Sequence, residues 1–122
     1  MANPINPRPS NRTHLTATIS TAADGLSETV NLTGHTLSAI QMSTAWTAAH
    51  IGFNVLIGDS TTHHPLYNTT GNHLTYPTSA NRVISFDPAV FAGIQKLQLA
   101  SKTTAGVAVA QAAARLITLS LA

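Results

Sequence analysis

Only four side chains in this sequence carry a carboxylate, which leaves few starting points for acid and base chemistry. They are Asp24, Glu28, Asp59 and Asp87. Asp24 and Asp59 stand beside glycines typical of turns, and Asp87 precedes Pro88, where an aspartate caps a helical turn. No two have a spacing that indicates a general acid paired with a base, and no G-x-S-x-G motif offers a serine nucleophile. We expect no enzymatic activity.

The histidines are the best candidates for metal chemistry. His63 and His64 are adjacent, and His73 follows in the same polar segment, STTHHPLYNTTGNH, which also contains Tyr67. Imidazoles that meet in space can bind zinc or nickel. However, adjacent residues of a strand point to opposite faces, and no cysteine or carboxylate stands in the segment. We therefore expect an outward-facing loop of solvated side chains, with no metal and no cofactor.

Trp46 is the only tryptophan, and it lies between small residues in the run MSTAWTAA. It could serve as a sugar-binding platform or as a core residue at the end of the fold. A platform usually has further exposed aromatic residues beside it, yet the chain has only two tyrosines, and the pattern places its three phenylalanines in the core. We favour the core position.

Composition excludes several classes of function. Only 8% of the 122 residues are charged, against about 25% in ordinary domains, so the surface is polar through hydroxyl and amide groups. The net charge of +2 reflects the scarcity of acids, and only Arg8 and Arg12 lie close together, which does not favour nucleic-acid binding. Cysteine is absent, and no apolar stretch is long enough to span a membrane. The start of the chain also lacks a secretion signal, which predicts synthesis in a cytosol.

The chain divides into an arm and a domain. Residues 1–12, MANPINPRPSNR, are rich in proline and asparagine and have little apolar content, which predicts an extended N-terminal arm. From residue 13 onward, apolar residues recur at every second position, as in the stretch HLTATIS. Residues 13–122 are therefore expected to form one domain of a size that can bury a core.

Short alternating segments separated by turns predict the fold. IGFNVLIGD places Ile51, Phe53, Val55 and Ile57 on one face of a strand, and AAARLITLSLA closes the chain as another strand. DPAVFAGI predicts one short helical turn, and the histidine segment predicts an edge strand at Leu66–Tyr67 because proline is excluded from central strands. The expected fold is all-β, a single antiparallel β-sandwich or jelly-roll-like domain. Its expected core includes Trp46, Phe53, Val55, Phe86, Phe91, Leu97, Ile117 and Leu119.

Several motifs in a fixed order resemble a known family. They are LSAIQM followed by AWTAA and IGF, then LY and GN, then DP with F and GI before L-x-L, and a closing QAA-x-R-x-I-x-L. In this order, over residues 17–121, the sequence resembles small virion structural proteins of tailed bacteriophages. It departs from the family pattern at GDSTTHHPLY and at Ala114, where relatives often carry an acid.

This resemblance implies a β-sandwich head decoration (cement) protein, or the capsid-bound base of a head fibre. Such a protein would be made in the bacterial cytoplasm and would end on the capsid surface of the virion, where it stabilises the head lattice. Its expected partners are the major capsid protein and other copies of itself, with a trimer expected from analogy with other decoration proteins. It would bind neither nucleic acid nor membrane. We expect the arm to contact the capsid through Asn6, Pro7, Arg8, Pro9 and Arg12.

An alternative function belongs to a different class. The chain could be a module of a tail or fibre that binds a host-surface glycan through Trp46, Tyr67, Tyr76 and the histidine loop. This alternative requires an exposed Trp46.

Overall fold

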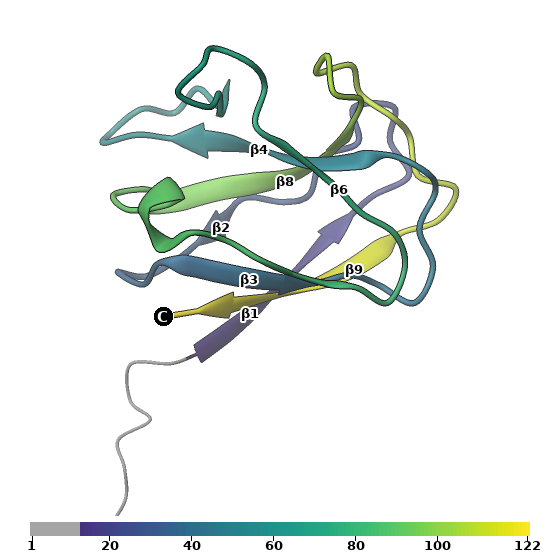
Figure 1. Cartoon of the computed structure of the whole chain (residues 1–122), viewed down its shortest axis with the longest axis horizontal. Helices are drawn as coiled ribbons and strands as arrows, with labels where there is room; N and C mark the ends of the chain where they lie inside the picture. The colour runs from purple at the N-terminus through teal and green to yellow at the C-terminus, as the bar shows by residue number, and fades with distance from the viewer. Residues whose placement is uncertain (1–12) are drawn as a thin grey trace, which may run out of the picture.

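The computed structural model describes residues 13–122, which form two antiparallel sheets packed face to face (Figure 1). The first sheet has four strands in the order β1-β9-β3-β7: β1 is Thr13–Ile19, β9 Arg115–Leu121, β3 Leu37–Gln41 and β7 Val83–Ser85. In the second sheet β2 (Val30–Asn31), β8 (Lys96–Lys102) and β4 (His50–Leu56) are neighbours in that order, and β5 (His64–Pro65) and β6 (Thr75–Pro77) both pair with β4. The predicted all-β sandwich is confirmed.

The order of the strands makes this sandwich a jelly roll. The chain passes from one sheet to the other at almost every connection, so β1, β3, β7 and β9 share one layer and β2, β4, β5, β6 and β8 share the other. In Figure 1, β4 and β8 form the upper layer and β3, β9 and β1 the lower one. The last strand, β9, lies between β1 and β3, and it pairs with β1 over seven residues, from Thr13↔Leu121 to Ile19↔Arg115.

The core lies between the sheets and is filled by the inward-facing half of each strand. Phe53 is fully buried, and its ring meets those of Phe86, Phe91 and Tyr76 edge to face, with centroids 5.7, 4.9 and 6.2 Å away. Edge-to-face contacts suit the quadrupoles of aromatic rings. Of the residues expected in the core, those that are buried are Phe53, Val55, Phe86, Phe91, Leu97, Ile117 and Leu119. Trp46 is half-buried against this core.

Two local features agree with what the sequence predicts. Gly25 has a φ of +64° in the turn after β1, and a Cβ there would lie 2.7 Å from the carbonyl oxygen of Ser101, so only glycine fits. The predicted helical turn is the 3₁₀ turn η2 (Pro88–Val90), where the side chain of Asp87 accepts a hydrogen bond from the Ala89 N–H at 3.0 Å.

Other expectations at the edge of the second sheet were wrong. Ile57 is 61% exposed because β4 ends at Leu56 and the chain turns away at Gly58, where φ is +61°. The edge strand comprises His64–Pro65, two residues earlier than predicted, although the Leu66 N–H still donates to the Phe53 carbonyl at 2.9 Å and Tyr67 forms a bridge with His73. Its short pairing with β4 is compatible with proline, because the strand lies at an edge. The prediction also missed β6, whose three residues give no clear alternation.

A buried side-chain amide joins two loops at one end of the sandwich. Gln111 is 2% exposed, and it pairs with the backbone of Thr47 as a strand residue would: Oε1 accepts from the Thr47 N–H at 2.8 Å and Nε2 donates to the Thr47 carbonyl at 3.0 Å. Nε2 also donates to Ser101 Oγ at 2.8 Å. Arg115 completes the group, because its Nε donates to Gln111 Oε1 and its Nη2 to Thr47 Oγ1, both at 3.1 Å. This network fixes the Trp46 loop to the start of β9.

Removing the Gln111 amide should therefore destabilise the fold. In Gln111→Ala, the N–H and carbonyl of Thr47 lose their partners in a part-buried place, which is expected to cost about 2–3 kcal/mol. Urea denaturation followed by circular dichroism measures the loss. Gln95→Ala, at an exposed position, is the matched control and should change stability by less than about 0.5 kcal/mol. Equal stability of the two variants would contradict the role of the network.

Candidate functional site

The outward-facing half of the four-stranded sheet is the most distinctive surface of the molecule. Register places Thr16 opposite Thr118, Thr18 opposite Leu116, and Gln41 opposite Val83. Side chains of residues paired in register lie on the same side of a sheet. The residues before and after them in each strand point to the other side, toward the core. We call this surface the outer face; it consists of His14, Thr16, Thr18, Ala39, Gln41, Val83, Ser85, Leu116, Thr118 and Ser120.

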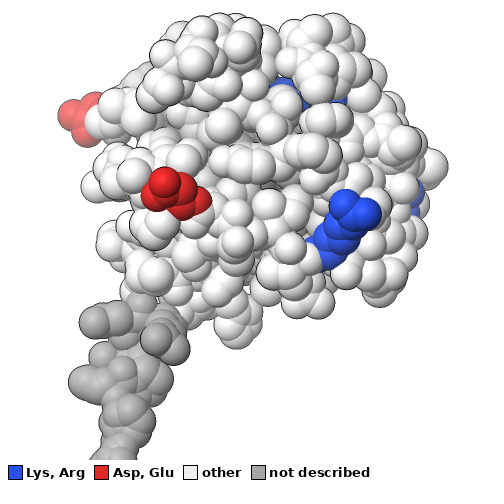
Figure 2. Space-filling view, viewed as in Figure 1, with Lys and Arg blue, Asp and Glu red and all other residues white. Residues whose placement is uncertain are grey.

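The outer face carries no Lys, Arg, Asp or Glu among its residues. Its polar groups are mostly hydroxyls, and two aliphatic side chains stand out of it, Leu116 at 57% and Val83 at 68% exposure. Figure 2 shows how sparse charge is on one side of the molecule, where single red and blue side chains stand apart on an uncharged surface. The outer face can therefore be buried against a partner without removing water from a charged side chain.

The second sheet differs, because described segments cover its outside. Ala100 and Lys102 of β8 point outward yet are only 1% and 6% exposed, because loop residues such as Asp24, His73 and Gly106 lie over them. The side chain of Lys102 lies across Gly52, close to the carbonyl of Leu74. Only the first sheet therefore offers a broad open face.

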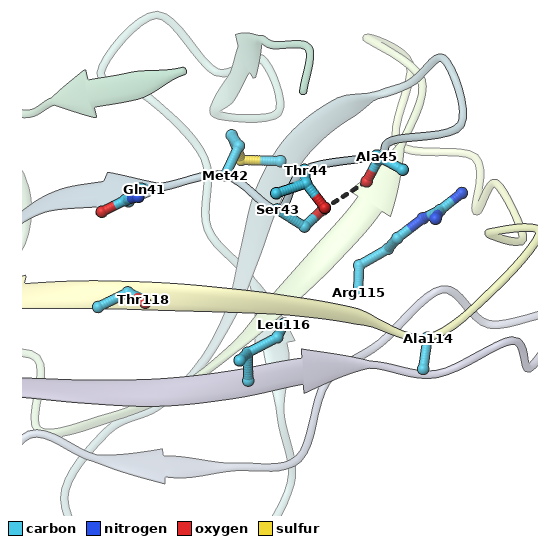
Figure 3. A pocket seen from close by; sticks show the side chains of 9 residues that line it. All are labelled: Gln41, Met42, Ser43, Thr44, Ala45, Ala114, Arg115, Leu116 and Thr118. Atoms are coloured by element: carbon cyan, nitrogen blue, oxygen red, sulfur yellow. Dashed lines mark hydrogen bonds between the residues drawn. The ribbon is translucent and has the colours of Figure 1, made fainter. Parts of the chain in front are cut away.

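A hollow of about 380 Å³ indents one end of the outer face (Figure 3). Its walls are the segment 41–45, where β3 leaves the sheet, and the segment 114–118 at the start of β9. In Figure 3 the Arg115 side chain extends away from Gln41 and Thr118, toward the loops that hold its guanidinium. The Ser43 hydroxyl donates to the Ala45 carbonyl and shapes the opposite wall. The hollow is large enough for one side chain of a partner.

The outer face ends at an edge of β1 that is only partly paired. The Thr18 N–H donates to Glu28 Oε1 at 2.8 Å, and Ile19 forms a bridge with Ser27. Within residues 13–122, no other strand pairs with this edge of β1. A free strand edge can accept a partner strand through its main-chain groups.

The histidines of the predicted loop do not come together. His63 Nε2 is 2.9 Å from Thr29 Oγ1, whereas His73 Nε2 is 3.1 Å from the Tyr67 hydroxyl, with the two rings 4.4 Å apart. His64 and Tyr67 are exposed, and His63 and His73 are half-buried. No group of three or more His, Asp or Glu residues in the described chain is placed to hold a metal ion.

The aromatic residues considered for glycan binding also have separate neighbours. The Tyr76 ring contacts Phe53 and Phe86 at the core, Tyr67 lies against His73, and the Trp46 Nε1 donates to the Ala49 carbonyl at 3.1 Å. These three rings do not form a shared platform. The proposed arm contacts, Asn6, Pro7, Arg8, Pro9 and Arg12, lie outside the described residues.

Sequence reasoning did not single out the outer face, although a signal was present. The outward half of HLTATIS and of RLITLSL consists of threonine, serine, histidine and one leucine, whereas Arg115 falls in the other half, in register with Ile19. Each half looks like an ordinary wet strand face. Only the register of β1, β9, β3 and β7 joins them into one surface.

Comparisons of the chain with protein-family models, with curated proteins and with solved structures found no match. Separately, none of the helical segments in residues 13–122 has the length and apolar character to cross a membrane.

The ionisation of Tyr76 tests its placement. Burial raises the pKa of Tyr76, and the nearby Asp87 carboxylate raises it further. The folded protein keeps the hydroxyl protonated where an unfolded tyrosine ionises, so this stabilisation is complete below about pH 10 and is lost as the pH rises through the folded-state pKa. Urea midpoints of the wild type should fall relative to those of Tyr76→Phe as the pH rises above about 10, the ordinary pKa of tyrosine. If the urea midpoints of the two proteins changed equally with pH, the burial of this hydroxyl would be contradicted.

Proposed function

We propose that the chain is a structural protein of a tailed-bacteriophage virion, which binds the outer surface of the head and stabilises the capsid lattice. The observation that carries the proposal is the uncharged, hydroxyl-rich outer face with its two exposed aliphatic side chains. The order of motifs that resembles small virion proteins supports it independently.

The chemistry of the outer face suits broad contact with a protein. The core of a protein–protein interface is depleted in charged residues, and this face presents none. Leu116 and Val83 supply apolar area, and the hollow beside Leu116 supplies a place for one protruding side chain. The face has no pair of groups suited to catalysis, so the geometry favours adhesion over chemistry.

The distribution of charge supports a part for the arm. All four acidic residues and four of the six basic residues lie in 13–122, so the formal charge of that part is zero. Arg8 and Arg12 therefore carry the whole net charge of +2. We propose that residues 1–12 contact the major capsid protein beside β1, while the loop with His64 and Tyr67 faces away from the head. A homo-oligomer, expected to be a trimer, would engage several such sites at once and gain avidity.

The fold alone does not decide between the two proposals, since jelly rolls occur in viral capsid proteins and in lectins. The glycan-binding alternative is supported by one observation, the 49% exposed Tyr67 ring beside His73. Its weakness is that Trp46 and Tyr76 pack against the core.

Co-sedimentation with phage heads tests the proposal. Purified protein is mixed with expanded heads that lack this protein, tails and fibres, and the bound fraction is measured against capsid protein. We expect saturable binding at a fixed ratio to the capsid subunit. Absence of binding to heads would overturn the proposal and direct the search to tails, fibres and glycans.

A pair of exposed aliphatic residues locates the binding face. Leu116→Glu places a charge on the outer face beside its hollow and should weaken head binding about tenfold or more. Ile57→Glu is the matched control, because Ile57 is similarly exposed, at 61% against 57%, but lies in the loop after β4. Both variants should remain folded. Equal loss of binding, or no loss in either, would show that the outer face is not the contact.

Deletion of residues 1–12 tests the arm separately. We expect the shortened protein to keep the midpoint of thermal unfolding and to bind heads several-fold more weakly, with a smaller dependence on salt because Arg8 and Arg12 are gone. Unchanged head binding would overturn the role of the arm without affecting that of the outer face.

A further inference from the structure

A second hollow, of about 210 Å³, lies on the outside of the five-stranded sheet, away from the outer face. Its lining includes Asn54 of β4 with Ala100 and Lys102 of β8, and the loop residues Asp24, His73 and Gly106. Apart from His73, which belongs to the histidine loop of the glycan-binding alternative, none of these residues has a part in the contacts proposed above.

Lys102 is the unusual residue of this hollow. It is only 6% exposed, and its side chain lies across β4, where a Cβ at position 52 would be 2.9 Å from Lys102 Cδ. Gly52 therefore leaves room for the lysine to reach over the sheet. Burial lowers the pKa of Lys102 and is the only cause of the shift, so no carboxylate of the described residues compensates its charge.

The apolar stem of Lys102 is covered while its amine keeps contact with water, and a partly desolvated charge without a counterion gains from an anionic partner. Arg115 shows the contrast, since its half-buried guanidinium donates to Gln111 and Thr47. In the hollow, Asn54 adds a half-buried amide that can also donate. The lining thus offers one cation and one neutral donor, together with the Asp24 carboxylate.

The roof of the hollow is formed by His73, which is packed on two sides. The His73 ring packs against Tyr67 on one side, and a Cβ at position 106 would overlap it on the other, so glycine is required there. His73 Nδ1 is buried and has no hydrogen-bond partner among the described residues. A preformed hollow avoids part of the ordering cost of binding.

We propose that this hollow binds a carboxylate, with the Lys102 ammonium as its counterion and the Asn54 amide as a second donor. A monoanion fits better than a phosphate dianion, because there is a single cation and the Asp24 carboxylate also lines the hollow. The carboxylate could be a glutamate or aspartate side chain of a partner protein or a small free acid.

The chain contains only two lysines, Lys96 and Lys102, and both lie on β8. Lysine labelled with ¹³C at Cε therefore gives two signals, and exposed Lys96 serves as an internal control. The signals are followed by NMR against pH in sodium acetate and in sodium chloride of equal ionic strength. We expect acetate to raise the pKa of Lys102 saturably and to leave the Lys96 signal unchanged. No shift in acetate, or equal shifts of both lysines, would overturn the proposal.

Variants check the assignment of the donors. In variants that lack Lys102, acetate binding is followed by the NMR signal of the Ala100 backbone amide, which lies at the floor of the hollow. Lys102→Met keeps the apolar stem and removes the charge, so it should stay folded and bind acetate at least about tenfold more weakly, whereas Lys96→Met should bind as the wild type does. Asn54→Ala should weaken binding less than Lys102→Met. Tighter binding of inorganic phosphate than of acetate would overturn the preference for a monoanion.

A final comparison identifies the source of the carboxylate. If Lys102→Met weakens co-sedimentation with heads and Lys96→Met does not, the carboxylate belongs to a side chain of the capsid. If acetate binds and head binding is unchanged, it belongs to a free acid. The acetate titration does not depend on the proposed function, so a failure of head binding leaves the carboxylate site standing.

Discussion

The insertion of β9 between β1 and β3 is the constraint on which the rest of the structure depends. β9 pairs with both strands, so the end of the chain completes a sheet that begins at residue 13. Ile117 and Leu119 of β9 are fully buried and close the core over Phe53 and its aromatic neighbours. Because these contacts join distant parts of the chain, the core forms only when the last strand is in place. The bond between Gln111 and Thr47 fixes where that strand begins.

The same topology makes the two sides of the sandwich unequal. The connections around β4 and β8 are long, and they fold over the five-stranded sheet, where they enclose the hollow at Lys102. The four-stranded sheet keeps its outer side open because no described loop lies across it. An open, uncharged face can be buried against another protein at little cost in desolvation, which is why its role is proposed to be adhesion. The covered side offers instead a small hollow lined by Lys102, Asn54 and Asp24.

The low charge content makes each buried polar group informative. Gln111 and Arg115 bond to each other and to Thr47, so their network contributes to stability. Lys102 lies on the neighbouring side of the fold without such compensation. Arg115 thus has its partners within the described residues, whereas Lys102 has none there and is proposed to bind a carboxylate.

The sequence by itself determined the class of fold and the inward face of most strands, because period-two alternation in stretches such as HLTATIS and RLITLSL needs no distant information. It also determined local features such as the cap at Asp87 and the turn at Gly25. It could not determine where β4 ends, since Ile57 continues the alternation although the chain has already left the sheet. Nor could it find the partner of Gln111, which is 64 residues away, or join Thr16, Leu116 and Val83 into one face. Register between distant strands decides these features, and register is a property of the packed sheets rather than of any single segment.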